Sequence, residues 1–175
     1  LENGGKVLWF PERDCYASQT VGGLFQTDYW NYRMFETISR NNRKPVSPGT
    51  MGLLIDPSHP LFRSFPTDFH TNWQWFPIVK QSYPLILDYF PKGYRPIVQV
   101  IDNIERNHKL GLIFELAVGK GKLLVCMSNL EAVDDKPEVR QLYCSMLDYM
   151  ASGDFNPKTA VSLSLIHISE PTRHS

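Results

Sequence analysis

Hydrophobic residues recur along the chain at two spacings, one typical of helices and the other of strands. Residues 30–42 and 137–150 carry apolar side chains every three or four positions with charged residues between them, which predicts two amphipathic helices. Short apolar runs bounded by Gly, Pro or Asp predict strands, and these lie at residues 6–10, 52–55, 85–88, 96–101, 110–118 and 122–127. Short strands mixed with two amphipathic helices indicate a layered α/β domain.

The clearest unit in this pattern is a hairpin. Two apolar strands, 110–118 and 122–127, are joined by Gly119-Lys120-Gly121, a tight connection. Because a tight hairpin joins antiparallel strands, we expect a mixed sheet rather than a purely parallel one.

The second predicted helix has recognisable start signals. Pro137 fits the first helical turn, and Asp135 is a plausible cap. The stripe that we expect this helix to bury comprises Val139, Leu142, Tyr143, Met146, Tyr149 and Met150.

Composition and charge narrow the class of protein. The 175 residues are 42% hydrophobic, enough for one domain with a sizeable core. The 18 basic and 18 acidic residues give a formal net charge of zero, and no basic stripe is present, which argues against a nucleic-acid partner. No apolar run approaches a membrane-spanning length, so we expect no membrane partner either.

Cysteines and histidines give no sign of a metal site or a disulfide framework. The three cysteines, Cys15, Cys126 and Cys144, lack paired short spacings. Cys126 and Cys144 lie within apolar patterns, so we expect both to be small buried hydrophobic residues. None of the five histidines forms an H-x-x-x-H pair. We therefore expect no metal and no cofactor.

Motifs for nucleotide binding or nucleophilic catalysis are also missing. "VGKGKLLV" differs from a phosphate loop because a strand, not a helix, follows it. No G-x-S-x-G elbow is present, and Cys15 lacks the strand-to-helix context of such an elbow. We assign no catalytic residue from these patterns.

A charged loop offers a further candidate site. Asp102, Glu105, Arg106 and His108 gather in "IDNIERNHKLG", where an acid, a base and an imidazole could form a general acid–base site. Charged residues just before a buried strand more commonly form a solvated turn with local ion pairs, and we favour that interpretation.

Tryptophans provide the candidate binding residues. In "FHTNWQWFP", Phe69 to Pro77, an extended backbone would place Trp73 and Trp75 on the same face. Paired indoles can stack on the apolar face of a sugar ring, or they can seal the edge of a core. Packing is the favoured interpretation, while Trp73, Trp75 and Trp30 are the candidates for carbohydrate contact.

The two ends of the sequence look unlike a natural domain. The first residue is Leu1 rather than Met, and we expect the protein to continue in both directions. "LSLIHISEPTR", Leu163 to Arg173, resembles a translated sequencing adapter. The expected organisation is a domain over 1–152, a linker or the start of a next segment over 153–162, and a non-native tail over 163–175.

Longer phrases carry a resemblance to a known family. The segments "LFQTDYWNYRMFETIS", "GTMGLLIDPSHPLFRSFPTDFHTNWQWFPIV", "RPIVQVIDNIERNHKLGLIFELAVGKGKLLVCM" and "RQLYCSMLDYM" resemble the C-terminal region of bacterial glycoside hydrolases of family 2, the β-galactosidase-like group. "DPSHPLF" followed by "GKGKLLV" also resembles class I glutamine-amidotransferase-like domains, which occur as non-catalytic appendages of such enzymes.

This resemblance implies a fold and a division of labour. The fold would be a flavodoxin-like, class I glutamine-amidotransferase-like layered domain with a mixed sheet, incomplete at its N-terminus. The catalytic (β/α)8 barrel would lie upstream, with its acid/base glutamate in an Asn-Glu pair. This chain has no such pair, and its nearest approach is Asn103-Ile104-Glu105. Retaining hydrolysis needs two carboxylates about 5 Å apart, and no such pair can be assigned here.

We therefore expect a non-catalytic accessory domain with a structural or docking role. Its partner would be the upstream barrel of the same polypeptide, with oligosaccharide as a further candidate ligand, and the resemblance implies a periplasmic or exported protein. Two alternatives stay open. One is a carbohydrate-binding module that uses Trp73 and Trp75. The other is a stand-alone amidotransferase-like enzyme, which the missing nucleophile elbow disfavours.

Overall fold

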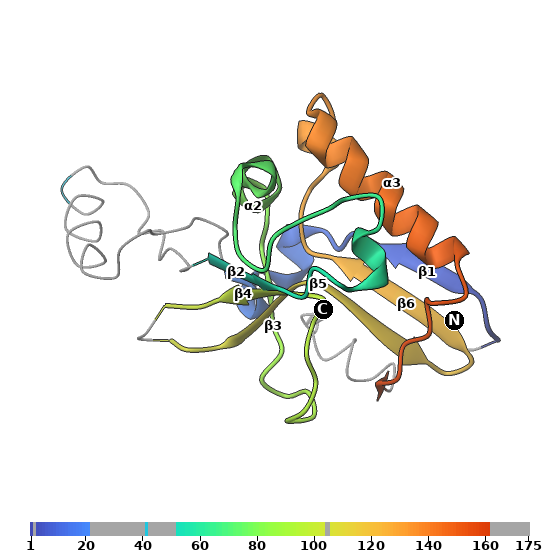
Figure 1. Ribbon diagram of the computed structural model, residues 1–175. Helices are drawn as coiled ribbons and strands as arrows, with labels where there is room; N and C mark the ends of the chain where they lie inside the picture. Colours follow the sequence, from blue (N-terminus) through green and yellow to red (C-terminus); the bar gives the residue numbers. More distant parts are fainter. Residues whose placement is uncertain (2, 22–40, 42–51, 104–105, 162–175) are drawn as a thin grey trace.

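The computed structural model of the chain describes residues 1, 3–21, 41, 52–103 and 106–161, and these build one mixed α/β unit (Figure 1). Its strands are β1 (Lys6–Trp9), β2 (Gly52–Ile55), β3 (Leu85–Ile86), β4 (Val98–Ile101), β5 (Lys109–Val118), β6 (Gly121–Cys126) and β7 (Ala160–Val161). Its helices are α2 (Phe76–Lys80) and α3 (Pro137–Ala151), with short 3-10 segments at Arg13–Gln19, Pro60–Phe62, Trp73–Trp75 and Glu131–Val133.

All seven described strands belong to a single sheet. Its main path runs β1-β6-β5-β4-β2, and both β3 and β7 pair with β5. The β1–β6 and β5–β7 pairs are parallel, while β2–β4, β3–β5, β4–β5 and β5–β6 are antiparallel. The predicted mixed sheet is therefore confirmed.

The hairpin predicted within residues 110–127 is confirmed as the β5–β6 pair. Val118 pairs with Gly121, and Gly119 turns the chain with φ +58°, a value that glycine adopts without steric cost. The other predicted strands are also present, although the one expected at 85–88 is reduced to Leu85–Ile86. The helix expected over 30–42 lies, except for Asn41, outside the described residues.

Helix α3 confirms the second predicted helix, and Pro137 does lie in its first turn. The predicted Asp135 cap is wrong. Lys136 occupies the capping position without a side-chain cap bond, and the Asp135 carboxylate instead accepts a hydrogen bond from Lys136 Nζ at 2.5 Å.

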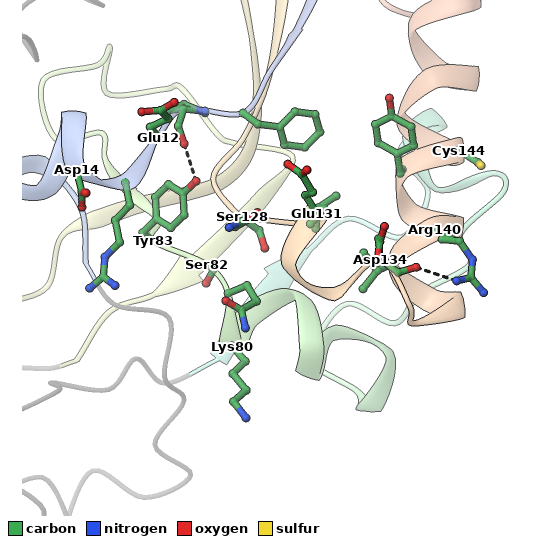
Figure 2. A pocket seen from close by; sticks show the side chains of 18 residues that line it. Glu12, Asp14, Lys80, Ser82, Tyr83, Ser128, Glu131, Asp134, Arg140 and Cys144 are labelled. Atoms are coloured by element: carbon green, nitrogen blue, oxygen red, sulfur yellow. Dashed lines mark hydrogen bonds between the residues drawn. The ribbon is translucent and has the colours of Figure 1, made fainter.

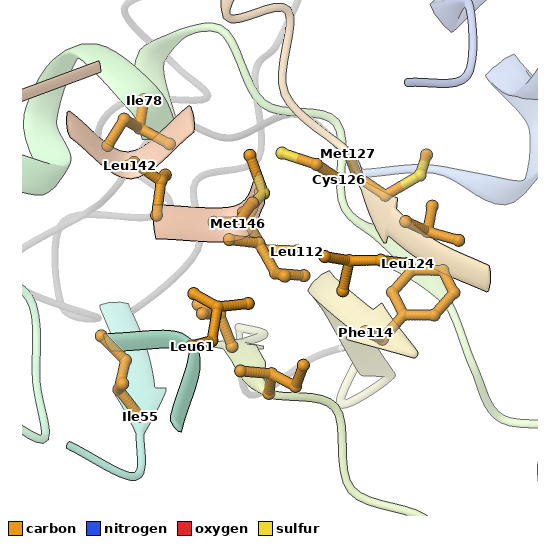
Figure 3. Close-up of a cluster of buried hydrophobic side chains, with 14 of the residues drawn as sticks. Ile55, Leu61, Ile78, Leu112, Phe114, Leu124, Cys126, Met127, Leu142 and Met146 are labelled. Carbon is orange, nitrogen blue, oxygen red and sulfur yellow. The ribbon is translucent and has the colours of Figure 1, made fainter. Parts of the chain in front are cut away.

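The buried core extends over both faces of the sheet, and α3 covers one of them (Figure 3). Most of the predicted stripe is buried there: Val139, Leu142, Met146, Tyr149 and Met150. Tyr143 and Cys144 are exposed, contrary to prediction, because they follow Leu142 by one and two positions and a helix of about 3.6 residues per turn rotates them off the stripe. Cys126, in β6, is fully buried as predicted.

Side chains fix α3 at several points along its length. Ser145 Oγ donates to the carbonyl of Leu61, which joins the helix to the segment after β2. Tyr149 donates to Glu115 Oε2 on β5 at 2.7 Å. At the C-terminal end, Lys6 Nζ on β1 donates to the carbonyl of Met150 at 2.5 Å, where a cation interacts favourably with the helix dipole.

The sheet has a second face, opposite α3. Trp9 and Phe114 both pair with Val125, and paired residues point to the same side of a sheet. Lys6 reaches α3 from β1, so Trp9, three positions along the strand, points to the other side. Leu87 packs so closely against the backbone of position 111 that this position requires glycine, because a Cβ there would lie 2.6 Å from Leu87 Cδ1.

Candidate functional site

A cavity of about 1050 Å³ lies beyond the carboxyl ends of the parallel strands β1 and β6 (Figure 2). In open α/β sheets, ligands commonly bind in this position. The cavity is lined by the segment after β1 (Phe10–Asp14), by the end of α2 and the residues that follow it (Lys80–Tyr83), by Ser128–Glu131 after β6, and by Asp134, Val139, Arg140, Tyr143 and Cys144.

The buried hydroxyls of this cavity hold its loops together. Tyr83 donates to the carbonyl of Pro11 at 2.5 Å, Ser128 Oγ donates to that of Ile78 at 2.6 Å, and Ser82 Oγ donates to that of Val79 at 2.7 Å. Burial, followed by the charges of Cys126 and Glu12, raises the pKa of Tyr83, so its hydroxyl stays a proton donor at neutral pH. These groups satisfy backbone carbonyls, which is a structural role.

The rim of the cavity carries charges of both signs. Glu12, Arg13 and Asp14 are exposed, and the Arg140 guanidinium donates to the carbonyl of Asp134 at 2.8 Å. Figure 2 shows the Cys144 thiol at the opposite edge of the cavity from Tyr83. The rim of the cavity therefore has no uniform charge, and the Cys144 thiol does not lie beside the Tyr83 hydroxyl.

The described part of the chain also lacks a recognisable nucleophile–base pair. Among the described residues, no Ser or Cys side chain is hydrogen-bonded to a histidine ring, the arrangement that activates a nucleophile. Within the same residues, no group of three His, Cys, Asp or Glu side chains is placed to hold a metal ion. None of the described helices is long and apolar enough to cross a membrane.

The two candidate tryptophans of the 69–77 segment have opposite environments. Trp75 is 0% exposed, packs edge-on against Phe62 and Phe65, and donates from Nε1 to Thr67 Oγ1 at 2.8 Å. Trp73 is 86% exposed. Burial of Trp75 confirms the packing interpretation for that residue alone.

The expected shared face of Trp73 and Trp75 is wrong because the backbone is not extended there. Asn72 Oδ1 accepts from the Gln74 N–H at 3.2 Å and starts a 3-10 turn that continues into α2. A turn rotates successive side chains around an axis instead of alternating them between two faces. The third candidate, Trp30, lies outside the described residues.

Trp73 has an aromatic neighbour of its own. Its ring centroid lies 6.1 Å from that of Phe76, which is 55% exposed. We call Trp73 and Phe76 the exposed aromatic pair. The 3-10 turn capped by Asn72 leads directly into α2, so this turn sets the positions of both Trp73 and Phe76.

The charged loop after β4 differs in part from the solvated turn that the sequence favoured. The local ion pair exists, with Arg106 Nη2 2.5 Å from Asp102 Oδ1. However, Asp102 is only 5% exposed, and its Oδ2 also accepts from the backbone N–H of His108 at 3.0 Å. Asp102 is therefore a buried residue that holds the loop together through Arg106 and the His108 N–H. Glu105 lies outside the described residues.

The ring of His108 is paired with a residue that the sequence pattern did not single out. His108 Nδ1 lies 2.7 Å from Asp88 Oδ2, and the other oxygen of Asp88 accepts from the Lys109 N–H at 2.7 Å. The two residues are 20 positions apart and meet because β3 pairs with the start of β5, Ile86 against Leu110. The advance signal was an acidic residue at the end of one predicted strand and a histidine two positions before another.

One comparison with known proteins identifies the family. A family model described as a domain of unknown function, DUF8487, matches residues 1–169. The chain belongs to the DUF8487 family. No curated protein matches it.

The C-terminal part of this DUF8487 chain departs from the expected organisation in one describable way. Phe155 is fully buried, and β7 pairs in parallel with β5, so the segment after α3 contacts the domain at these two points. Residues 162–175, which include the suspected adapter sequence, lie outside the described residues, and the family match extends to residue 169. The non-native origin of the tail stays a prediction.

Proposed function

We propose that the chain is a non-catalytic C-terminal accessory domain of a carbohydrate-degrading glycoside hydrolase of family 2, with a structural, domain-docking role. The observation that carries this proposal is the exposed aromatic pair, Trp73 and Phe76. Large exposed aromatic side chains are typical of interaction surfaces, where they contribute disproportionately to binding. The partner surface is the catalytic barrel upstream in the same polypeptide.

The loop that carries the pair is well ordered for docking. Trp75 anchors it in the core, Asn72 caps its turn, and Gln74 Nε2 donates to the carbonyl of Pro66 at 2.9 Å. A surface held in one conformation before binding loses less entropy when its partner arrives. This supports a docking role over that of an incidental exposed tryptophan.

Two features support a non-catalytic role. The sequence has no Asn-Glu pair, and the buried hydroxyls of the cavity beyond β1 and β6 are bonded to backbone carbonyls. The amidotransferase-like alternative gains no support from the cysteines, because burial raises the pKa of Cys126 to about 12 and Cys144 lies in the middle of α3.

We further propose that the sheet is part of a flavodoxin-like layered domain of the class I glutamine-amidotransferase-like kind. β1 and β6 are parallel neighbours although they lie far apart in the sequence, and α3 follows β6 and packs back over the sheet. A helix that returns across parallel strands is characteristic of such layers.

Recovery of the complete reading frame tests the proposal, together with separate expression of this domain and the region before it. We expect an upstream barrel with paired glutamates, and saturable association of the two parts. Trp73→Ala and Phe76→Ala should each weaken that association by about tenfold or more, as central aromatic contacts do. An upstream region without such a barrel, or one that does not associate with the domain, would contradict it.

A carbohydrate-binding role is the second candidate, and the exposure of the Trp73 indole specifically favours it. A flat indole open to solvent can stack on a sugar ring. Trp75, the other residue expected to contribute, is inaccessible in this fold. Oligosaccharide titration separates the two roles, because Trp73→Ala would abolish glycan binding in one case and weaken association with the barrel in the other.

A further inference from the structure

A second cavity, of about 720 Å³, lies on the sheet face opposite α3. Its floor is formed by Phe114, Leu116, Leu123 and Val125 of β5 and β6, which share that face. Its size is within the usual range for a small-molecule site, and its lining is mostly apolar, as such sites are. It is separate from the exposed aromatic pair, since neither Trp73 nor Phe76 lines it.

Aromatic side chains form its walls. Trp9 and Tyr16 meet edge-to-face with ring centroids 5.6 Å apart, and Phe90 lines the cavity from the loop after β3. All three are half-buried, so each ring is accessible in part. Such rings offer flat apolar surfaces for the C–H face of a ligand.

Beside the polar side chains of Ser18 and Gln19, an acid–imidazole pair lines the cavity. Asp88 and His108 line the cavity, joined by the 2.7 Å contact between Asp88 Oδ2 and His108 Nδ1. The backbone N–H of Lys109 holds the other oxygen of Asp88, and buried Asp102 holds the backbone N–H of His108. The pair is therefore fixed in place from both sides before any ligand arrives.

The Asp88 carboxylate of this pair offers hydrogen-bond acceptors. The carboxylate oxygens of Asp88 keep lone pairs beyond those that meet the His108 ring and the Lys109 N–H, and the second ring nitrogen of His108 adds a further hydrogen-bonding atom. A ligand that hydrogen-bonds to the Asp88 carboxylate must provide donors, and hydroxyl and ammonium groups are both donors.

Local charge decides between these donors. Burial raises the pKa of Asp88, but the hydrogen bonds from His108 and the Lys109 N–H, with the charges of both residues, lower it further, so the carboxylate is ionised at neutral pH. Lys109 follows His108 directly and offsets that negative charge. The Lys109 ammonium, which donates to the carbonyl of Lys92 at 3.5 Å, does not line the cavity, but its charge acts on Asp88 and disfavours a further cation there. An anionic ligand would be repelled by the Asp88 carboxylate. A neutral hydroxyl ligand avoids both costs.

We propose that this cavity binds a neutral polyhydroxylated ring, the size of a monosaccharide or disaccharide, with its hydroxyls on Asp88 and His108 and its apolar face against Trp9, Tyr16 and Phe90. This inference is independent of the docking proposal, because it uses no residue of the exposed aromatic pair. It applies whether or not the chain associates with an upstream barrel.

Calorimetric titration of the whole chain with methyl β-D-galactoside, methyl β-D-glucoside and methyl α-D-mannoside tests the site. We expect saturable binding of at least one glycoside, weakened about tenfold or more by Asp88→Asn and by His108→Ala, since each change removes a hydrogen-bonding group that the ligand would use. Trp73→Ala and Asp135→Asn, which replaces an exposed carboxylate outside the cavity, should bind like the unchanged chain.

A spectroscopic readout keeps the proposal falsifiable if Asp88→Asn or His108→Ala folds poorly. In the unchanged chain, the bound glycoside should shift the ring resonances of His108 and leave those of His59 in place. Absence of binding by all three glycosides, binding without a His108 shift, or equal affinity in a folded Asp88→Asn variant would overturn the proposal. Selective binding of choline or inorganic phosphate at this pair instead would show that the ligand class is wrong.

Discussion

Trp73 and Trp75 are the same residue type two positions apart, yet one is 86% exposed and the other 0% exposed. The difference arises from one polar side chain, because Asn72 starts the 3-10 turn that sends the two indoles in different directions. Trp75 then contributes to the stability of the domain, and Trp73 remains available to a partner. Two tryptophans two positions apart can thus have opposite exposure, and under the proposed docking role one serves folding and the other recognition.

Trp75→Ala should have the largest effect on stability. Removal of a fully buried indole costs about 3–5 kcal/mol of unfolding free energy, a large share of the roughly 5–15 kcal/mol of a typical domain. Urea denaturation followed by circular dichroism measures it. Trp73→Ala provides the matched control, and equal destabilisation by the two substitutions would remove the distinction between them.

Thr67→Val should lower the unfolding free energy less than Trp75→Ala does. The variant keeps the shape of Thr67 but leaves the indole N–H of Trp75 without its acceptor. A buried donor without a partner costs about 1–3 kcal/mol. Thr159→Val, at a half-buried threonine whose side chain makes no hydrogen bond to the described part of the chain, is the control in the same denaturation experiment. An unchanged midpoint for Thr67→Val would mean that the hydrogen bond does not hold Trp75.

His59 should make the unfolding free energy of the domain depend on pH. Its Nδ1 accepts from the Leu61 N–H at 3.2 Å, and its ring packs near Phe62, which contacts Trp75. Burial lowers the pKa of His59, opposed in part by the charge of Asp56. The unfolded chain, whose histidine has a pKa of about 6.5, therefore binds more protons than the folded chain as the pH falls through that value.

Unfolding free energy should consequently decrease as the pH is lowered from about 7, until the pH passes below the folded-state pKa. His59→Asn keeps a cap acceptor without titrating, so this variant should lose that part of the pH dependence. Denaturation curves at several pH values provide the measurement. Identical slopes for the variant and the unchanged chain would contradict the assignment to His59.

Trp73→Ala should have the smallest effect on stability. An exposed side chain away from the core typically changes the unfolding free energy by about 0.5 kcal/mol or less. The expected consequence appears in binding, where association with the upstream region weakens. A Trp73→Ala domain that unfolds readily would show that Trp73 has a structural role.

Local patterns explain what could be predicted of the fold. The β5–β6 hairpin and α3 were predictable because hydrophobic period and turn residues lie within one short segment for each. The overall strand order was not, since β1 pairs with β6 across more than a hundred residues of sequence. Pairing between distant segments depends on the complete set of side chains that share the core.

The candidate sites were less predictable for the same reason. Trp75 is buried against Phe62 and Phe65, which are distant in the local pattern. The alternation of Trp73 and Trp75 suggested an extended backbone, whereas the structure has a 3-10 turn capped by Asn72. Asp88 and His108 meet only through the β3–β5 pairing. Sequence periodicity identifies which residues are apolar or polar, and it does not show which distant residues they will contact.

Hydrogen exchange of the backbone amides of residues 69–76 tests the central claim most directly, measured in the isolated domain and again with the upstream region attached. We predict that the N–H groups around the exposed aromatic pair exchange more slowly when the upstream region is present, and that Trp73→Ala reduces this added protection. Equal exchange rates with and without the upstream region would contradict the docking role of Trp73 and Phe76.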